Sequence, residues 1–213
     1  GGAGTYTAGL AFGGQLATPT KTAATETYNG SSWTNVASMN TARRNFGGTG
    51  TQTAAITADT NTELWNGSSW SETTDLNTPR TSVMTSRGSS TSSVLVFGGL
   101  TPAPATVAIT ESWNGSAWTE VADLSTARQV GGGAGSGNTS ALVFGGNTPS
   151  VTANTELWNG SSWTEVNDLN QARANLGGTG TQTAAIAFGG YNAAISPAYP
   201  TNTEIWNGTN WTE

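Results

Sequence analysis

Short apolar runs recur along the chain, and polar, glycine-rich stretches separate them. Val94–Phe97 and Leu142–Phe144 are examples, and both have the length of a β-strand rather than of a helix. Thr, Ser, Gly and Asn fill the intervening positions, and these residues favour strands and tight turns. The pattern therefore predicts an all-β chain.

The runs belong to a tandem repeat built around the motif W-N-G-x-x-W. Its second Trp recurs at intervals of 37, 48, 45 and 48 residues. Residues 177–186 repeat residues 47–56 letter for letter. The second tryptophans are Trp33, Trp70, Trp118, Trp163 and Trp211, and the aromatic residues that open the motif are Tyr28, Trp65, Trp113, Trp158 and Trp206.

Each repeat divides into four short strands. We expect the first around Thr49 to Thr53 and the second in the run that ends at Gly146, whereas the third spans Thr155–Trp158 and the fourth Trp163–Val166. Asn-Gly, a strong signal for a short hairpin, separates the third from the fourth. Four strands in each repeat predict a β-propeller made of one domain, residues 1–213. Its five repeats cover about residues 1–45, 46–82, 83–130, 131–175 and 176–213.

A Gly-Gly doublet closes the apolar strand of four repeats, and the two spaced aromatic residues follow it. The doublets are Gly13-Gly14, Gly98-Gly99, Gly145-Gly146 and Gly189-Gly190. This arrangement resembles the kelch repeat over essentially the whole chain, which implies kelch-like four-stranded blades and identifies no ligand. The wording T-E-L-W-N-G-S-S-W-T-E-V-x-D-L is also similar to repeats in structural proteins of marine bacteriophages.

The second repeat departs from the pattern, because it has no Phe-Gly-Gly. Glu63 also follows Ile56 about nine residues sooner than the other repeats predict. Either this blade has lost half of its second strand or residues are missing from the numbering at this point. The chain starts in register with Gly47 and stops at Glu213, inside the motif W-T-E. We therefore expect a segment of a longer polypeptide, which could hold more than five blades.

Composition narrows the function. Only seven residues are Lys or Arg, they form no cluster, and the net charge is −6, so we expect no nucleic-acid partner. No apolar run approaches the roughly 18 residues that span a bilayer, so we expect no membrane insertion. Cys and His are absent, which excludes thiol catalysis, zinc–thiolate sites and imidazole bases. We expect no cofactor and no metal.

Charge is periodic as well. The repeated acids are Glu26, Glu63, Glu111, Glu156 and Glu204, and the repeated arginines are Arg43, Arg80, Arg128 and Arg173. We predict that these residues pair within or between blades and fix the register of the blades. The alternative is a ring of arginines around the axial channel that binds an acidic ligand.

The repeated aromatic residues are expected to be structural. An aromatic side chain at the same phase of every blade is placed to pack between neighbouring blades, where its burial contributes about 1.5–3 kcal/mol. A row of exposed rings that stack on sugars is the alternative.

Variable loops follow the Gly-Gly doublets, over residues 15–25, 100–110, 147–155 and 191–203. Loops on a repeat scaffold emerge on one side, so together they form a candidate binding face. Tyr191 and Tyr199 are the candidate anchors, since Tyr is enriched at interaction hot spots and paratopes. Asn147 and Gln15, which begin two of the loops, are further binding candidates.

An enzyme is not expected. The copper oxidases among kelch-type propellers need His and a Tyr–Cys pair, and a glycosidase needs two carboxylates at one unique place. Asp59 is the one acid outside the repeat positions, so no catalytic pair is visible.

The leading hypothesis is a structural or binding domain of a phage virion, in the tail, a fibre or on the capsid, with an attachment or assembly role. Its partners would be other virion proteins or a receptor or glycan on the host surface, within a larger assembly. One alternative is a secreted or cell-surface bacterial adhesin that binds glycans, located outside the cell. A kelch-type adaptor for protein partners is the other.

Overall fold

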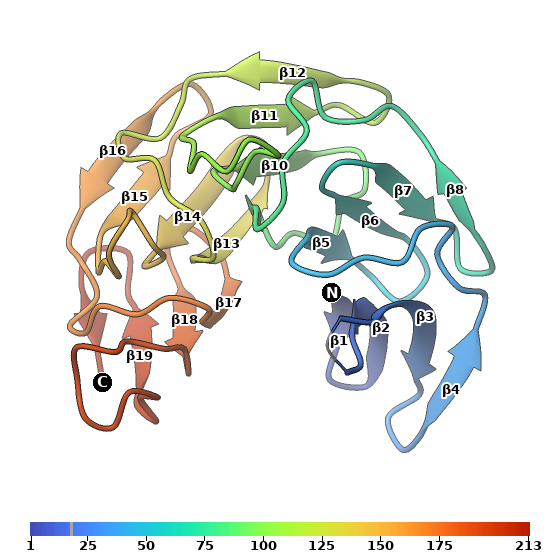
Figure 1. The fold of residues 1–213 in the computed structure, drawn as a ribbon, viewed down its shortest axis with the longest axis horizontal. Coiled ribbons are helices and arrows are strands. Elements are labelled where there is room, and N and C mark those ends of the chain that lie inside the picture. Colours follow the sequence, from blue (N-terminus) through green and yellow to red (C-terminus); the bar gives the residue numbers. More distant parts are fainter. Residues whose placement is uncertain (18) are drawn as a thin grey trace.

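The structure is a computed structural model that describes residues 1–17 and 19–213. Its strands form five four-stranded antiparallel sheets, each with its strands in chain order (Figure 1). Blade 1 contains β1 (Gly2–Thr5), β2 (Ala8–Gln15), β3 (Lys21–Tyr28) and β4 (Trp33–Val36), and blade 2 contains β5 (Gly47–Gly50), β6 (Ala55–Ala58), β7 (Thr62–Trp65) and β8 (Trp70–Glu72). Blade 3 contains β9 (Met84–Thr85), β10 (Val94–Phe97), β11 (Thr110–Trp113) and β12 (Trp118–Val121), and blade 4 contains β13 (Gly132–Gly137), β14 (Ser140–Phe144), β15 (Thr155–Trp158) and β16 (Trp163–Val166). Blade 5 contains β17 (Gly177–Gly180), β18 (Ala185–Phe188), β19 (Thr203–Trp206) and β20 (Trp211–Thr212).

The five blades follow one another around a common centre. The first strands of the blades lie near the centre, and strands β4, β8, β12 and β16 lie at the rim (Figure 1). This is a five-bladed β-propeller, and the predicted all-β fold with four-stranded blades is confirmed.

Asn and Gly have separate roles in the hairpin between the third and fourth strands. In blade 4, Trp158 and Trp163 face each other across the sheet, so four residues form the loop. The side-chain oxygen of Asn159 accepts hydrogen bonds from the backbone N–H groups of Ser161 (2.9 Å) and Ser162 (3.0 Å). Gly160 has a φ of +98°, which favours glycine. The same arrangement in the other blades explains why the motif repeats.

The core lies between the blades. Four clusters of buried apolar side chains each join two consecutive blades, from blades 1 and 2 to blades 4 and 5. Eight of the nine tryptophans are buried, with 0–7% of their surface exposed, whereas Trp33 is 51% exposed. Large aromatic rings thus supply much of the core in a chain with few Leu and Ile.

The predicted position of one strand is wrong, and so is one of the two alternatives for blade 2, the loss of half of its second strand. The first strand of blade 2 is Gly47–Gly50, which is earlier than Thr49 to Thr53. The second strand of this blade, Ala55–Ala58, is a full four residues long and pairs throughout with β7. Blade 2 has therefore lost its Phe-Gly-Gly and loop rather than half of a strand, and the backbone N–H of Asp59 donates to the carbonyl of Asn61 in the tight turn that remains.

Among residues 1–17 and 19–213, no helix is long and apolar enough to cross a membrane.

Candidate functional site

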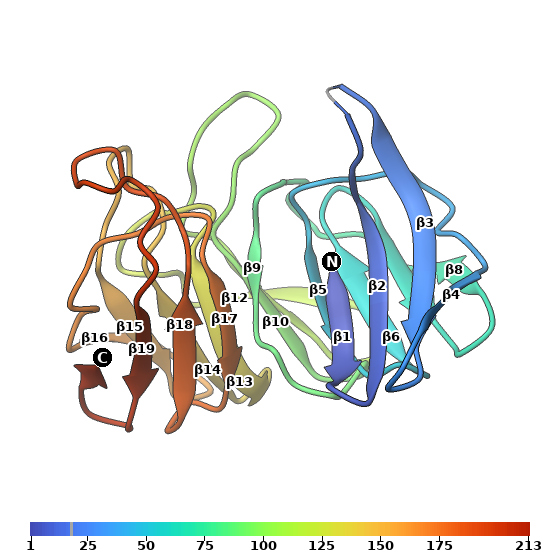
Figure 2. The same ribbon diagram turned by 90° about the horizontal axis from the view of Figure 1, so that it is seen from below.

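The loops between the second and third strands project from one side of the molecule. Figure 2 shows the β2–β3, β10–β11, β14–β15 and β18–β19 connections at the same end, opposite the β1–β2 turn. We call this end the loop face. Blade 2 contributes only residues 59–61 to it. In blade 1, β2 extends through Gln15 and β3 begins at Lys21, so strand pairing continues into the predicted loop, of which residue 18 lies outside the described part.

The two candidate anchor tyrosines lie together on the loop face. The rings of Tyr191 and Tyr199 are 5.2 Å apart between centroids and inclined by 50°. Tyr191 is half-buried and its backbone exchanges two hydrogen bonds with Ala174, at 2.8 and 3.0 Å. Tyr199 is 69% exposed. One ring is thus held by the blade, and it supports a second ring that faces solvent.

The loop that carries Tyr199 is anchored at its base and borders a cavity. The side chain of Asn192 is buried and donates to the carbonyl of Ala172 at 2.9 Å. The cavity has a volume of about 270 Å³, and Pro197 and Pro200, on either side of Tyr199 in sequence, line it. Its polar lining includes Gln171, Thr201, Asn202 and Glu213. Amide, hydroxyl and carboxylate groups therefore line a cavity bordered by the loop that carries Tyr199.

The other two candidates lie elsewhere on the loop face and do not join the tyrosine pair. The side-chain oxygen of Asn147 is shielded from solvent and has no hydrogen-bond partner in the described part of the chain. The backbone of Asn147 pairs with that of Gln129, so this residue ties the loop to the blade. Gln15 is exposed, and its side chain accepts a hydrogen bond from Arg44.

The repeated charges form buried ion pairs. Each repeated arginine lies in the linker between the fourth strand of one blade and the first strand of the next, and it pairs with the glutamate of that next blade. The pairs are Arg43–Glu63, Arg80–Glu111, Arg128–Glu156 and Arg173–Glu204. All eight side chains are at most 3% exposed. The alternative of an arginine ring around the axial channel is therefore wrong, because these guanidinium groups are enclosed by protein.

Asp59, the acid outside the repeat phase, joins the first of these pairs. Its carboxylate accepts from Arg43 at 2.7 Å and from the backbone N–H of Asn61 at 3.2 Å. Burial raises the pKa of Asp59, and the guanidinium of Arg43 opposes this effect only in part. Asp59 is thus buried and shares one arginine with Glu63.

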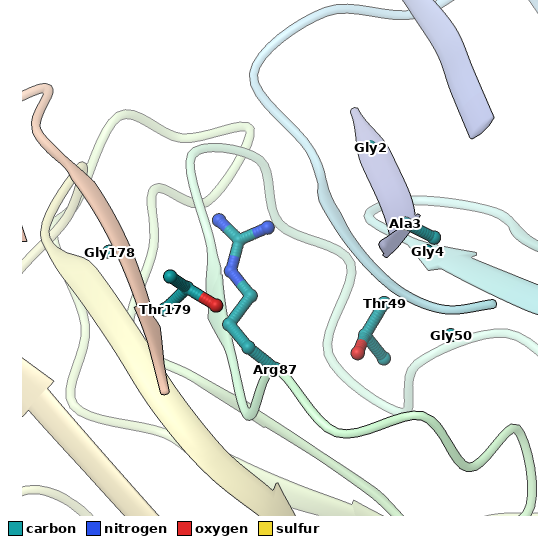
Figure 3. Close-up of a pocket in the computed structure, with 8 residues that line it drawn as sticks. All are labelled: Gly2, Ala3, Gly4, Thr49, Gly50, Arg87, Gly178 and Thr179. Atoms are coloured by element: carbon teal, nitrogen blue, oxygen red, sulfur yellow. The ribbon is translucent and has the colours of Figure 1, made fainter. Parts of the chain in front are cut away.

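A second cavity lies at the centre of the propeller, with a volume of about 230 Å³. Arg87 extends into it between the strand of Gly2–Gly4 and the strand of Gly178 and Thr179 (Figure 3). The guanidinium donates to the carbonyl of Gly48 at 3.2 Å. Arg87 keeps solvent exposure in the cavity, and partial desolvation by the surrounding protein lowers its pKa. Sequence reasoning missed this residue, although its place outside the repeated arginine phase was visible.

Comparison with known proteins identifies the fold and no family. No family model and no curated protein matches the chain. Among solved structures, the one titled "Structure of YjhT" matches with a TM-score of 0.79 and 12% sequence identity, over 99% of this chain and 82% of that one. At this identity the likeness shows the fold alone: the chain is a β-propeller similar in architecture to that protein.

Proposed function

We propose that this chain is a non-enzymatic recognition domain of a phage virion, and that its loop face attaches the particle to a glycan on the host surface. The observation that carries the proposal is the exposed ring of Tyr199, which packs on Tyr191 and belongs to a loop whose Pro197 and Pro200 line a polar cavity.

This arrangement suits a sugar. An aromatic ring offers a flat apolar surface to the C–H face of a pyranose, while amides and carboxylates bond its hydroxyl groups. Binding sites combine such an apolar surface with a few placed polar groups. Asn202 and Glu213 are already hydrogen-bonded to each other at 2.6 Å, which holds both groups in place at the cavity. A rigid scaffold that presents variable loops is also the usual arrangement of recognition proteins.

The virion assignment rests on the sequence of the repeat, which is similar to repeat sequences in structural proteins of marine bacteriophages. The kelch-like blade supplies the scaffold for this role. A fold held by buried ion pairs and interblade tryptophans suits a protein that must survive outside the cell.

An array of bacterial surface glycans identifies the glycan that the unmodified chain binds best. Tyr199→Ala is expected to bind this glycan at least ten-fold more weakly. The exposed ring contributes contact area to the ligand and little to the core, so the thermal midpoint should change by less than about 2 °C.

The matched control is Tyr6→Ala. Tyr6 is 91% exposed and lies in the β1–β2 turn, at the end opposite the loop face. Binding should be unchanged in this variant. Equal losses in both variants, or the absence of any bound glycan, would contradict a glycan site at Tyr199.

The virion assignment is tested by immunogold labelling of particles from the source sample, with antibody raised against the purified chain. Label on capsids, tails or fibres is the expected result. Label on bacterial surfaces or on cellular filaments would instead favour the adhesin, and label on complexes inside cells would favour the adaptor.

A further inference from the structure

Consecutive blades are joined by the same contacts at each of the four interfaces. The second tryptophan of a blade donates its indole N–H to a threonine hydroxyl of the preceding blade, at 3.0–3.2 Å. Its ring also packs on the phenylalanine of the preceding blade in the three cases where one is present, with centroids 4.8–5.1 Å apart. The hydrogen-bonded pairs are Trp70–Thr25, Trp118–Thr62, Trp163–Thr110 and Trp211–Thr155.

The outer faces of blades 1 and 5 carry the same groups in exposed positions. Trp33 is 51% exposed, although the tryptophans at the equivalent position of the other four blades are 4–7% exposed. Phe188 is 45% exposed, whereas the phenylalanines in its phase are at most 1% exposed. Thr203 is exposed, while the threonines in its phase are buried. Blade 5 therefore presents one half of the repeated interface and blade 1 the other half.

A linker arginine completes each interface. Arg173 illustrates its contacts: the guanidinium donates to the carboxylate of Glu204 (2.7 Å) and to the carbonyls of Gly189 (3.2 Å) and Asn202 (3.0 Å). Asn170 precedes it in the linker and donates through its backbone and side chain to the same carboxylate, at 2.6 and 2.9 Å. One glutamate thus receives both an arginine and an asparagine from the preceding linker.

Blade 1 has a cavity where its neighbours have this arginine. The cavity has a volume of about 260 Å³, and its lining includes Gly13, Ala24 and Glu26. These are the residues in phase with the three partners of Arg173. Glu26 is half-buried, and no ion pair involves it among the residues that the structure describes. The cavity therefore offers a carboxylate and two carbonyl-bearing residues in the arrangement that holds a guanidinium in the other blades.

We infer that the cavity beside Glu26 is a guanidinium site for the linker arginine of a further blade of this repeat, which packs between blades 5 and 1. The tryptophan of that blade covers Phe188 and bonds Thr203, and its own phenylalanine and threonine receive Trp33. Its linker then places Arg beside Glu26 and Asn beside the carbonyl of Trp33.

A second copy of the chain does not fit this site. Its four linker arginines are 0–2% exposed and each is paired with a glutamate of its own chain. None can reach Glu26 of another molecule unless a blade opens. Repetition of the interface, rather than simple exposure of apolar surface, thus specifies a further linker and blade as the occupant.

The test uses the full chain and a peptide with the sequence of residues 166–176, V-N-D-L-N-Q-A-R-A-N-L. We expect saturable binding in calorimetry. The peptide with Arg173→Ala should bind at least ten-fold more weakly, and the chain with Glu26→Gln should show the same loss for the unmodified peptide. Equal binding of both peptides would overturn the guanidinium site.

A lengthened chain removes the dependence on the affinity of a free peptide. The chain is extended by another copy of residues 166–213 and then of residues 166–176, which supplies one blade and its linker. We expect slower hydrogen exchange in β4 and β19 than in the unextended chain, and Glu26→Gln should reverse this protection in β4. Unchanged exchange in both strands would overturn the proposal. So would a dimer of the unextended chain that Glu26→Gln dissociates, because a second copy would then be the occupant.

Discussion

Arg80→Met is expected to destabilise the protein by about 3–5 kcal/mol, because it leaves the carboxylate of Glu111 buried without a cation. Both side chains are fully buried. The guanidinium also donates to the carbonyls of Gly98 and Thr78, at 2.9 Å each, and these groups lose a donor in the variant. Denaturant unfolding at pH 7, followed by tryptophan fluorescence, gives the free energy of unfolding.

The chain contains its own control for this experiment. Glu26 has the same phase as Glu111 but is half-buried and has no ion pair in the described part of the chain. Glu26→Gln should therefore change the free energy of unfolding by less than about 1 kcal/mol. Adding Glu111→Gln to Arg80→Met should recover part of the loss, since a neutral amide still accepts from the backbone N–H of Asn77. A loss below about 1 kcal/mol for Arg80→Met would refute a structural role for the pair.

The sequence predicts the regular parts of the blades best where strong patterns coincide. The third and fourth strands of blade 4 begin and end as predicted, because the repeated Trp and Thr-Glu mark the ends of these strands in the sequence. The first strands are glycine-rich, and Gly47–Gly50 has no apolar alternation that would mark its ends. Charge periodicity also predicts that Glu and Arg pair, and the linker places each arginine against the next blade.

The candidate site is predicted less completely, since loops lack a repeat phase. Their common side follows from the scaffold, but the packing of Tyr199 on Tyr191 depends on a loop conformation that no pattern in the sequence specifies. Asn147 is a polar residue at the start of a variable loop, which predicts an exposed side chain, yet its side-chain oxygen is shielded from solvent. Trp33 shows the opposite error. The repeat predicts that Trp33 is buried like the equivalent tryptophans of the other blades, but its burial depends on whether a neighbouring blade covers it.

Trp158→Ala is expected to cost about 3–5 kcal/mol, as large-to-small changes of buried aromatic residues do. Trp158 is 1% exposed, packs on Trp163 with centroids 5.4 Å apart, and donates its indole N–H to the carbonyl of Asn138 at 2.9 Å. Trp33→Ala is the comparison, and we expect a loss below about 1.5 kcal/mol, since half of this ring already lies in solvent. Both losses are read from denaturant unfolding. Equal losses would mean that Trp33 is buried in solution, and an unchanged midpoint for Trp158→Ala would show that the interblade tryptophans do not hold the fold.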